Sequence, residues 1–449
     1  MKLWQMAVVL TLGATGSALA QVTAVASGSG QSVPTLTQEE LPGLVTMYKK
    51  LHAAPELSHQ EVKTSALLAG ELRQFGYKVT EDVGKYPDGT QAHGVVAVLE
   101  NGPGPRLLIR ADMDALPVEE KTGLPYASHV RGRTGAGQDV GVMHACGHDV
   151  HVTTMVGVAK NLAALKSEWH GTVMLVGQPS EETIDGAKAM LDDGLYKRFG
   201  RPDMAIALHD ANFSAGTVSV VPGYALASST GLDVVMRGIG SHGSQPEAGK
   251  DPIVMSAEFI VELQTIVSRS TPPQKAAVLT VGDIHGGTKR NIIPDEVKME
   301  LNFRAYDEGV RQTILQGIER TAKGVGIAAG VPENRMPVVT MLEYTPATYN
   351  DPALSGRLTE LFRKKLGEKN VIEKPPIMGS EDFGLFSDGG KIPSVIFWLG
   401  AYDPALVAKS VDSGVALPSP HSSLFAPLPE PALKTGIIAM TDAALELLR

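Results

Sequence analysis

The sequence has almost no cysteine, no long apolar run after its first residues and no cluster of basic residues. Cys146 is the single cysteine among 449 residues, so an internal disulfide is excluded. Beyond residue 20, no segment reaches the roughly 18 apolar residues that a membrane-spanning helix needs, so no membrane partner is expected for the mature chain. A net charge of -9 without a basic run argues against nucleic acid as a partner.

The first residues have the pattern of a secretory signal. Residues 1–20 begin with the basic Lys2, continue with an apolar stretch and end in the small-residue motif Ala18-Leu19-Ala20. The alternative is a buried N-terminal helix. Residues 21–40 are rich in Ser, Gly, Thr and Gln, which predicts a mobile leader before a fold that begins near Leu41. We therefore expect an exported protein, periplasmic or secreted.

Apolar runs of strand length alternate with segments of helical period through the first half of the chain. The runs Val173-Met174-Leu175-Val176 and Ala205-Ile206-Ala207-Leu208 have no polar alternation, which is typical of strands buried on both faces of an α/β sheet. Active groups of such sheets lie where the strands end. In all, strands are expected here at 94–100, 106–110, 171–178 and 203–209, with helices after His151 and near Gly186.

The pattern changes between about Ala227 and Pro337. Residues 297–306 alternate apolar and polar side chains, as in a sheet covered on one side only. Asp251 before Pro252 predicts the N-cap and first turn of a helix that runs to about Arg269. These features indicate a small α+β domain inserted into the larger one.

After Thr345 the α/β pattern returns, with a helix predicted over 352–366, a buried strand over 394–399 and a last helix from about Glu430. The predicted fold class is α/β: a catalytic domain with a mixed, mainly parallel sheet flanked by helices, interrupted by a two-layer α+β lid or dimerisation domain. The predicted boundaries are 41–226 and 338–449 for the catalytic domain and 227–337 for the insert.

The densest group of reactive side chains lies at Met143-His144-Ala145-Cys146-Gly147-His148-Asp149-Val150-His151. Thiolate, imidazole and carboxylate groups bind zinc and similar divalent ions, and Gly147 gives the segment freedom to turn its neighbours inward. The alternative is a buried structural loop.

Other acids and a histidine follow predicted strands. Asp112 and Asp114 end one strand, Glu181-Glu182 follow another, and His209 ends a third. Taken singly, each has an ordinary explanation. The aspartates could form a turn or cap, the glutamates a solvated surface, and His209 could be a core histidine whose hydrogen bonds are satisfied. Because the carboxyl ends of parallel strands meet at one edge of a sheet, their joint occurrence favours one metal site.

Several motifs resemble subfamily D of the M20 peptidases, which contains hippurate hydrolases, N-acyl-amino-acid amidohydrolases and auxin-conjugate hydrolases. The resemblance covers nearly all of the mature chain in the expected order. It rests on His52-Ala-Ala-Pro-Glu-Leu-Ser58, Arg110-Ala-Asp-Met-Asp-Ala-Leu-Pro117, Met143-His-Ala-Cys-Gly-His-Asp149, Glu181-Glu182, Ser241-His-Gly243, Asn291-Ile-Ile-Pro294, Met378-Gly-Ser-Glu-Asp-Phe383 and Pro420-His421.

The resemblance implies two divalent ions and a metal-activated water. It assigns the metal ligands Cys146, His148, Glu182, His209 and His421, the general base Glu181, and the supporting residues Asp112 and Asp114, of which Asp114 orients a ligand. Asp210 departs from the family pattern, which has a hydrophobic residue after the histidine. Cys146 favours zinc, cobalt or nickel, while the carboxylates tolerate manganese.

The inserted domain has three further candidates. His242, flanked by Gly240 and Gly243, is expected to stabilise the oxyanion. Asn291 and Arg304 are expected to hold the substrate carboxylate, since a guanidinium binds a carboxylate at two points. In the family this domain also mediates dimerisation, so a homodimer is possible, and the sequence leaves open whether His242 acts in its own or a partner's site.

The predicted function is a metal-dependent amidohydrolase acting on N-acyl amino acids or similar carboxylate-bearing amides. A dipeptidase or carboxypeptidase on the same scaffold is the nearest alternative, and an exported binding module with an inactive metal site is the alternative outside catalysis. The glycines of 324–330 lack the spacing and the preceding strand of a dinucleotide loop, and the Gly-x-Ser-x-Gly motif of a serine nucleophile is absent.

Overall fold

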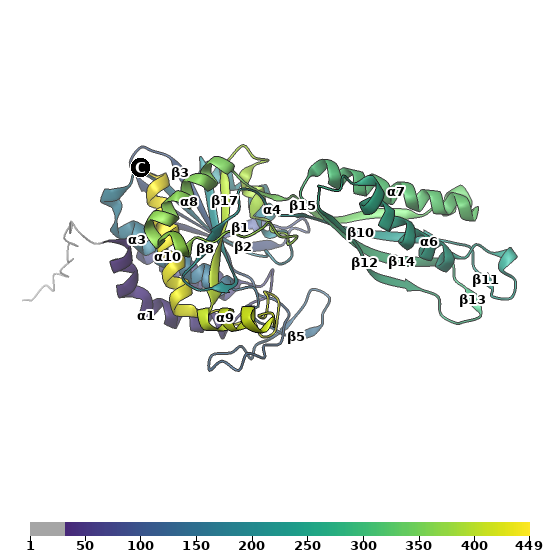
Figure 1. Cartoon of the computed structure of the whole chain (residues 1–449), viewed down its shortest axis with the longest axis horizontal. Coiled ribbons are helices and arrows are strands. Elements are labelled where there is room, and N and C mark those ends of the chain that lie inside the picture. Colours follow the sequence, from purple (N-terminus) through teal and green to yellow (C-terminus); the bar gives the residue numbers. More distant parts are fainter. Residues whose placement is uncertain (1–31) are drawn as a thin grey trace, which may run out of the picture. The chain divides into compact units, whose positions relative to one another are not determined.

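A seven-stranded sheet organises the larger part of the chain in the computed structural model, which describes residues 32–449 (Figure 1). The predicted signal segment, residues 1–20, lies outside the described residues. In their order across the sheet, the strands are β1 (Lys78–Lys85), β2 (Gln91–Asn101), β6 (Gly171–Gln178), β3 (Arg106–Asp112), β7 (Met204–Ser214), β17 (Ser394–Tyr402) and β8 (Val218–Val220).

The centre of this sheet is parallel and its margins are antiparallel. β3 pairs with β6 and β7 in parallel, and β7 pairs with β17 in the same sense. Leu107 and Ile109 enter one hydrophobic core, whereas Leu108 between them enters the core on the opposite face. The sheet is therefore buried on both faces, as its uninterrupted apolar runs predict.

Helices from both ends of the chain cover one face of the sheet. α1 (Val33–His52), α3 (His148–Ala164) and α10 (Pro429–Leu447) lie side by side there (Figure 1), next to α2 (Val62–Gln74) and α8 (Pro352–Leu366). On the other face, α4 (Gly186–Asp192) and α5 (Leu195–Phe199) contribute to the second core.

The start of the fold lies earlier than the sequence analysis placed it. Helix α1 already begins at Val33, so the prediction of a mobile leader is wrong for residues 33–40. Val33, Leu36 and Thr37 are buried in this helix. These buried positions recur at helical spacing. The apolar residues among them are too few to reveal a helix within a segment that is otherwise polar.

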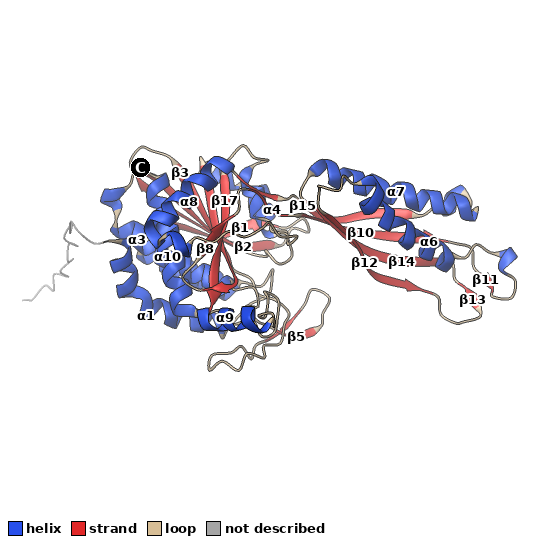
Figure 2. Cartoon of the chain, viewed as in Figure 1, coloured by secondary structure: helices blue, strands red, loops and turns tan. Residues whose placement is uncertain are grey.

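The inserted domain is a four-stranded antiparallel sheet with helices on one face, drawn red and blue in Figure 2. Its strands, in order, are β12 (Ala277–Gly286), β14 (Glu296–Ala305), β10 (Ser228–Arg237) and β15 (Val338–Thr345), and its helices are α6 (Pro252–Thr265) and α7 (Glu308–Ala329). Along β14, buried Met299, Leu301 and Phe303 alternate with more exposed polar residues. This alternation agrees with the predicted one-sided sheet.

The predicted boundary after residue 337 is wrong. β15 pairs with β10 from Val338 to Thr345, so these residues belong to the small sheet. The strand has few buried side chains, which makes it hard to assign from its sequence alone. The remaining elements are β4 (Arg131–Arg133), β5 (Asp139–Gly141), β9 (Gly223–Leu226), β11 (Ser241–His242), β13 (Ile292–Ile293), β16 (Thr348–Asn350) and α9 (Pro404–Ser413).

Two helix starts agree with their sequence signals. The Asp251 carboxylate accepts hydrogen bonds from the backbone N–H groups of Ile253 and Val254 and so caps α6. The predicted helix over 352–366 is α8, which Asp351 caps in the same way. Among residues 32–449, no helix combines the length and apolar character that a membrane crossing requires.

Candidate metal centre

The candidate centre lies where the parallel strands of the large sheet end. Asp112 is the last residue of β3, Gln178 is the last of β6, and His209 lies in β7 next to Trp398 of β17. His148 is the first residue of α3, after Gly147 with φ of 80°. A glycine adopts this left-handed conformation without strain, so the chain turns sharply between Cys146 and the helix.

All five predicted ligands meet in two overlapping groups. Cys146, His148 and His209 place one ligand atom each within 4.8 Å of one another, and so do Cys146, Glu182 and His421. The Cys146 Sγ atom is 3.5 Å from His209 Nε2, and Glu182 Oε2 is 3.4 Å from His421 Nε2. Residues far apart in the sequence thus come together, with Cys146 shared by both groups.

The histidine rings are oriented by hydrogen bonds from their Nδ1 atoms. His148 Nδ1 is 2.8 Å from the backbone carbonyl of Asp114, and His209 Nδ1 is 2.7 Å from the carbonyl of Asp210. A carbonyl only accepts, so each Nδ1 carries a proton, and in the neutral ring each Nε2 keeps a lone pair. Both Nε2 atoms are therefore available to a cation.

The donor set fits divalent cations. The His148 Nε2 and Glu182 Oε1 atoms are buried and have no hydrogen-bond partner among the described residues. Such atoms are costly unless something else satisfies them. Thiol, imidazole and carboxylate groups together match zinc and related ions.

The balance of buried charges also favours a cation site. Arg110 is the one buried lysine or arginine side chain among the described residues at this edge of the sheet, whereas the buried acids there include Asp112, Asp114, Glu181, Asp210, Glu381 and Asp382. This excess of carboxylates in a low-dielectric setting favours the binding of cations.

The pair Glu181-Glu182 follows a strained turn at Ser180. Ser180 before it has φ of 54°, a left-handed conformation that is rare for residues with side chains. The Glu61 carboxylate holds this turn by accepting hydrogen bonds from the Ser180 N–H group and hydroxyl, at 2.7 and 3.0 Å.

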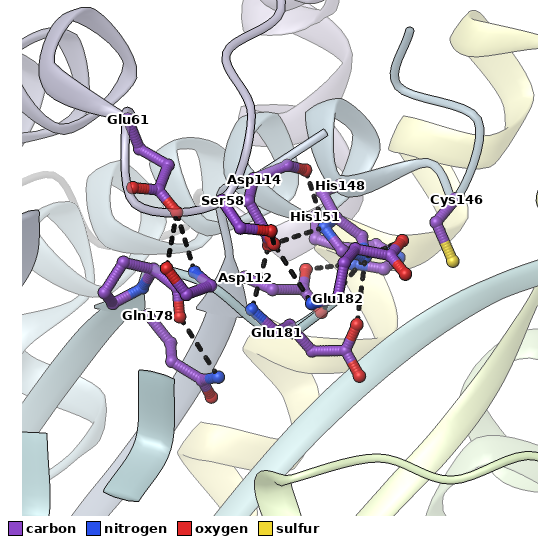
Figure 3. Close-up of polar contacts among 12 residues, drawn as sticks. Ser58, Glu61, Asp112, Asp114, Cys146, His148, His151, Gln178, Glu181 and Glu182 are labelled. Carbon is purple, nitrogen blue, oxygen red and sulfur yellow. Dashed lines mark hydrogen bonds and ion pairs between the residues drawn. The ribbon is translucent and has the colours of Figure 1, made fainter. Parts of the chain in front are cut away.

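Asp114 fixes the pair from the other side. Its carboxylate accepts hydrogen bonds from the backbone N–H groups of Glu181 and Glu182, at 3.1 and 3.0 Å, and from the Ser58 hydroxyl at 2.6 Å (Figure 3). Asp114 Oδ1 also lies 3.3 Å from His148 Nδ1. Asp114 therefore links His148, a candidate ligand, to the turn that carries both glutamates.

Burial shifts the protonation of both glutamates. Burial raises the pKa of Glu181 well above its usual range, and the nearby carboxylates of Glu381 and Glu182 raise it further. Burial also raises the pKa of Glu182, to about 7, although His148 opposes the shift. Carboxylates with raised pKa values are typical of sites that bind cations or transfer protons.

Asp112 lies behind the ligands in a buried network. Its Oδ2 atom accepts a hydrogen bond from Arg110 Nη1 at 2.5 Å and lies 3.6 Å from His148 Nε2, and its Oδ1 atom is 2.5 Å from His151 Nδ1. Burial raises the pKa of Asp112, but Arg110 and the two histidines outweigh this effect and hold it well below its usual range.

Sequence reasoning did not assign roles to several residues of this network. Arg110 donates hydrogen bonds to Glu381 at 2.6 Å and to Gln178 at 2.8 Å, and its Nη2 atom is 3.3 Å from Asp382. The motif Met378-Gly-Ser-Glu-Asp-Phe383 marked Glu381 and Asp382 as part of the resemblance. The sequence did not show that Arg110 is the partner of both.

A cavity of about 980 Å³ opens onto the predicted ligands. Apolar side chains form much of its wall, including Phe213, Leu226, Ile377 and Trp398. Cys146, Glu181, Glu182, His209 and His421 line it from the large domain, and Ser229, Asn302, Arg304 and Glu343 line it from the small sheet. A small molecule with an apolar group and an anionic group would fit such a wall.

The three candidate residues of the inserted domain lie in two different places. Arg304 lines the cavity, where its Nη1 atom donates a hydrogen bond to the Met378 carbonyl at 2.9 Å. His242 and Asn291 do not line it. They lie at one end of the short β11–β13 pair: His242 is the last residue of β11, Asn291 precedes β13, and the Gly243 N–H group donates to the Asn291 carbonyl at 2.9 Å.

An α/β sheet with this cluster of thiol, imidazole and carboxylate groups at its carboxyl edge defines a metal-dependent hydrolase. The model of peptidase family M20/M25/M40 matches residues 108–419, so the chain belongs to this family. The family predicted from the sequence motifs is thereby confirmed.

Individual relatives agree with this membership. The chain is 37% identical over 342 residues to a hippurate hydrolase of Campylobacter jejuni, across 76% of this chain and 83% of the relative. It is 33% identical over 406 residues to thermostable carboxypeptidase 2 of Saccharolobus solfataricus, across 90% and 95%. A dinuclear metal-binding M20 peptidase of Bacillus subtilis superimposes with a TM-score of 0.72 at 27% identity, across 92% and 99%.

Proposed function

We propose that the protein hydrolyses the amide bond between an acyl group and an amino acid whose carboxylate is free. One observation carries this proposal: five side chains of the kinds that bind metals converge near Glu181, and four of them line one cavity together with it. Such a constellation suits the cleavage of an amide, which resists attack by water alone.

Two divalent ions would be held by the sulfur, imidazole and carboxylate groups of Cys146, His148, Glu182, His209 and His421. When bound, the ions supply polarisation of the amide carbonyl and activation of water. Zinc, cobalt, nickel or manganese would suit this donor set.

Glu181 would be the general base. It follows the held turn at Ser180, lines the cavity and has an Oε2 atom 3.8 Å from His148 Nε2. The positive charge of bound ions would keep its carboxylate ionised, and it would then take a proton from water and return it to the leaving nitrogen. Asp114 positions both Glu181 and its neighbour Glu182 through their backbone N–H groups.

The cavity wall supports a substrate with an apolar acyl group and a carboxylate. Arg304 supplies the cation for the carboxylate, and Phe213, Leu226 and Trp398 supply an apolar wall for the acyl group. The relative named hippurate hydrolase is consistent with such a substrate, because hippurate is an aromatic acyl group joined to glycine.

A carboxypeptidase or dipeptidase activity is the second candidate, favoured by the relative named carboxypeptidase. The two activities differ in whether the acyl side is itself an amino acid. A binding module with an inactive centre is less well supported, since Glu181 and all five proposed ligands are present in the chain.

His242 and Asn291 stay candidates for a site completed by a second copy of the chain, because neither lines the cavity of its own chain. We propose export on the pattern of residues 1–20.

The test combines elemental analysis with a hydrolysis screen. The purified protein should contain two divalent ions per chain and cleave N-acetyl, N-benzoyl or longer N-acyl amino acids faster than dipeptides, and chelation should abolish the activity. Glu181→Gln should retain both ions and lose turnover by about 100-fold or more. Glu319→Gln, on the exposed side of α7, is the matched control. A Glu181→Gln protein with normal turnover would refute the proposed base.

A further inference from the structure

Asp210 is the one residue of the centre that departs from the family pattern, and it lies deep inside it. The residue follows His209 in β7, is 0% exposed and lines the cavity. A hydrophobic side chain at this position would simply pack, whereas a carboxylate there must be satisfied.

The hydrogen bonds of Asp210 do not satisfy its carboxylate. Its Oδ2 atom has no partner among the described residues. Its Oδ1 atom is 3.2 Å from His151 Nε2, but the Asp210 backbone N–H group donates to that same nitrogen at 2.9 Å. His151 Nε2 can donate to Oδ1 when the ring is protonated, whereas Oδ2 has no donor among the described residues in either case.

The Asp210 carboxylate faces the segment that carries two of the proposed ligands. A Cβ atom placed on Gly147 would lie 2.2 Å from Asp210 Oδ2, so the carboxylate sits directly against the backbone between Cys146 and His148. A third proposed ligand is also adjacent, because His209 Nδ1 is 3.6 Å from Asp210 Oδ1.

We propose that Asp210 is an additional anionic group of the ion site formed by Cys146, His148 and His209, and that it tightens the binding of the divalent cation held there. The proposal rests on the proposed function, since it presupposes a metal centre. A buried negative charge close to the ligands attracts the cation through a low-dielectric interior. The cation in turn compensates the charge of a carboxylate whose Oδ2 atom has no hydrogen-bond partner among the described residues.

This role predicts opposite effects with and without metal. Removing the charge relieves the metal-free protein of a buried, unsatisfied carboxylate, so its melting temperature should stay equal or rise. The same change removes an attraction for the cation. A purely structural aspartate would behave differently, because its loss would lower the melting temperature of the metal-free protein.

The experiment titrates Zn²⁺ or Mn²⁺ into chelator-treated full-length protein and follows binding by calorimetry. Asp210→Asn should weaken binding of one ion by about tenfold or more, the scale seen for residues that support metal ligands. Asp442→Asn is the matched control, because Asp442 is a buried aspartate that pairs with Lys365 at 2.7 Å and lies outside the cavity.

Asp210→Leu provides a second variant with the hydrophobic character expected from the family pattern, in case the asparagine is poorly tolerated. It should also bind one ion more weakly while its metal-free form melts no lower than wild type. Unchanged affinity in both variants, or weaker binding with a lower metal-free melting temperature, would overturn the role of Asp210. Wild-type protein that binds no divalent ion would instead overturn the proposed function itself.

Discussion

Most charged side chains at the carboxyl edge of the large sheet are buried, whereas most of those on the open face of the small sheet are exposed to solvent. At the carboxyl edge of the large sheet, Asp112, Asp114 and Arg110 are buried and held by several partners each. On the open face of the small sheet, Lys298 and Glu300 face solvent, and Arg304 turns toward the cavity. Buried charges are positioned by the fold itself, whereas the charges of the small sheet depend on what binds to them.

The largest effect expected from this contrast concerns the buried Arg110. Arg110→Met should lower the free energy of unfolding by about 4 kcal/mol, because it leaves Asp112 and Glu381 buried without their cation. Lys298→Met, the loss of an exposed cation from the small sheet, should change it by less than about 0.5 kcal/mol. Denaturant unfolding of the chelator-treated proteins measures both. Similar losses in the two variants would contradict the comparison.

The next effect is pH-dependent. Burial lowers the pKa of His52, but Asp149 and Glu120 outweigh burial and raise it from 6.5 to about 10. The folded state therefore binds the proton more tightly, so the stabilisation is complete below about pH 6.5 and is lost as the pH rises toward 10. His52→Gln should cost about 2 kcal/mol at pH 6 and much less at pH 10.

An exposed pair of a histidine and an aspartate in the small sheet is the control for this prediction. His285 lies 3.0 Å from Asp283, and its side chain is 81% exposed. His285→Gln should therefore change the melting temperature little at any pH. A gap between wild type and His52→Gln that grows with rising pH would show that the sign is wrong.

A smaller effect concerns substrate binding by the small sheet. Arg304→Met should raise KM about tenfold, equivalent to about 1.4 kcal/mol, because the substrate carboxylate loses its guanidinium partner. Its kcat should change less, since the lost contact is present in both the ground and transition states. Lys298→Met, on the same strand, should leave both constants unchanged. If kcat falls while KM stays constant, Arg304 acts in the chemical step and not in carboxylate binding.

The smallest expected effect is the loss of a helix N-cap, which should cost the same in both domains. Asp251 caps α6 of the small domain and Asp351 caps α8 of the large one, each through a hydrogen bond of 2.8 Å to a backbone N–H group. Asp251→Ala and Asp351→Ala should each cost about 1 kcal/mol in thermal unfolding. A several-fold larger cost for one of them would show that even local caps depend on the surrounding domain.

Much of the fold was predictable because its signals are local. The apolar runs at 173–176 and 205–208 are strands buried on both faces, and the alternation after Val297 is a strand covered on one face. The helix over 352–366 has the predicted bounds. The start of α1 at Val33 and the membership of β15 were missed, because both segments have weak apolar patterns that only their neighbours make decisive.

The sequence by itself determined which residue types end the strands, and therefore that Asp112, Glu181-Glu182 and His209 share one edge of the sheet. Strand direction suffices for this conclusion, because parallel strands end together. The resemblance to known motifs added His421, which no local pattern distinguishes from a surface histidine.

Only the tertiary structure decided which groups touch. It joined His421 to the segment of Cys146 through a hydrogen bond of 2.7 Å from its N–H group to the Ala145 carbonyl, paired Arg110 with Glu381, and left His242 outside the cavity of its own chain. These contacts join residues that are distant in sequence. Their geometry follows from how helices and loops pack over the sheet, and no short-range pattern encodes that packing.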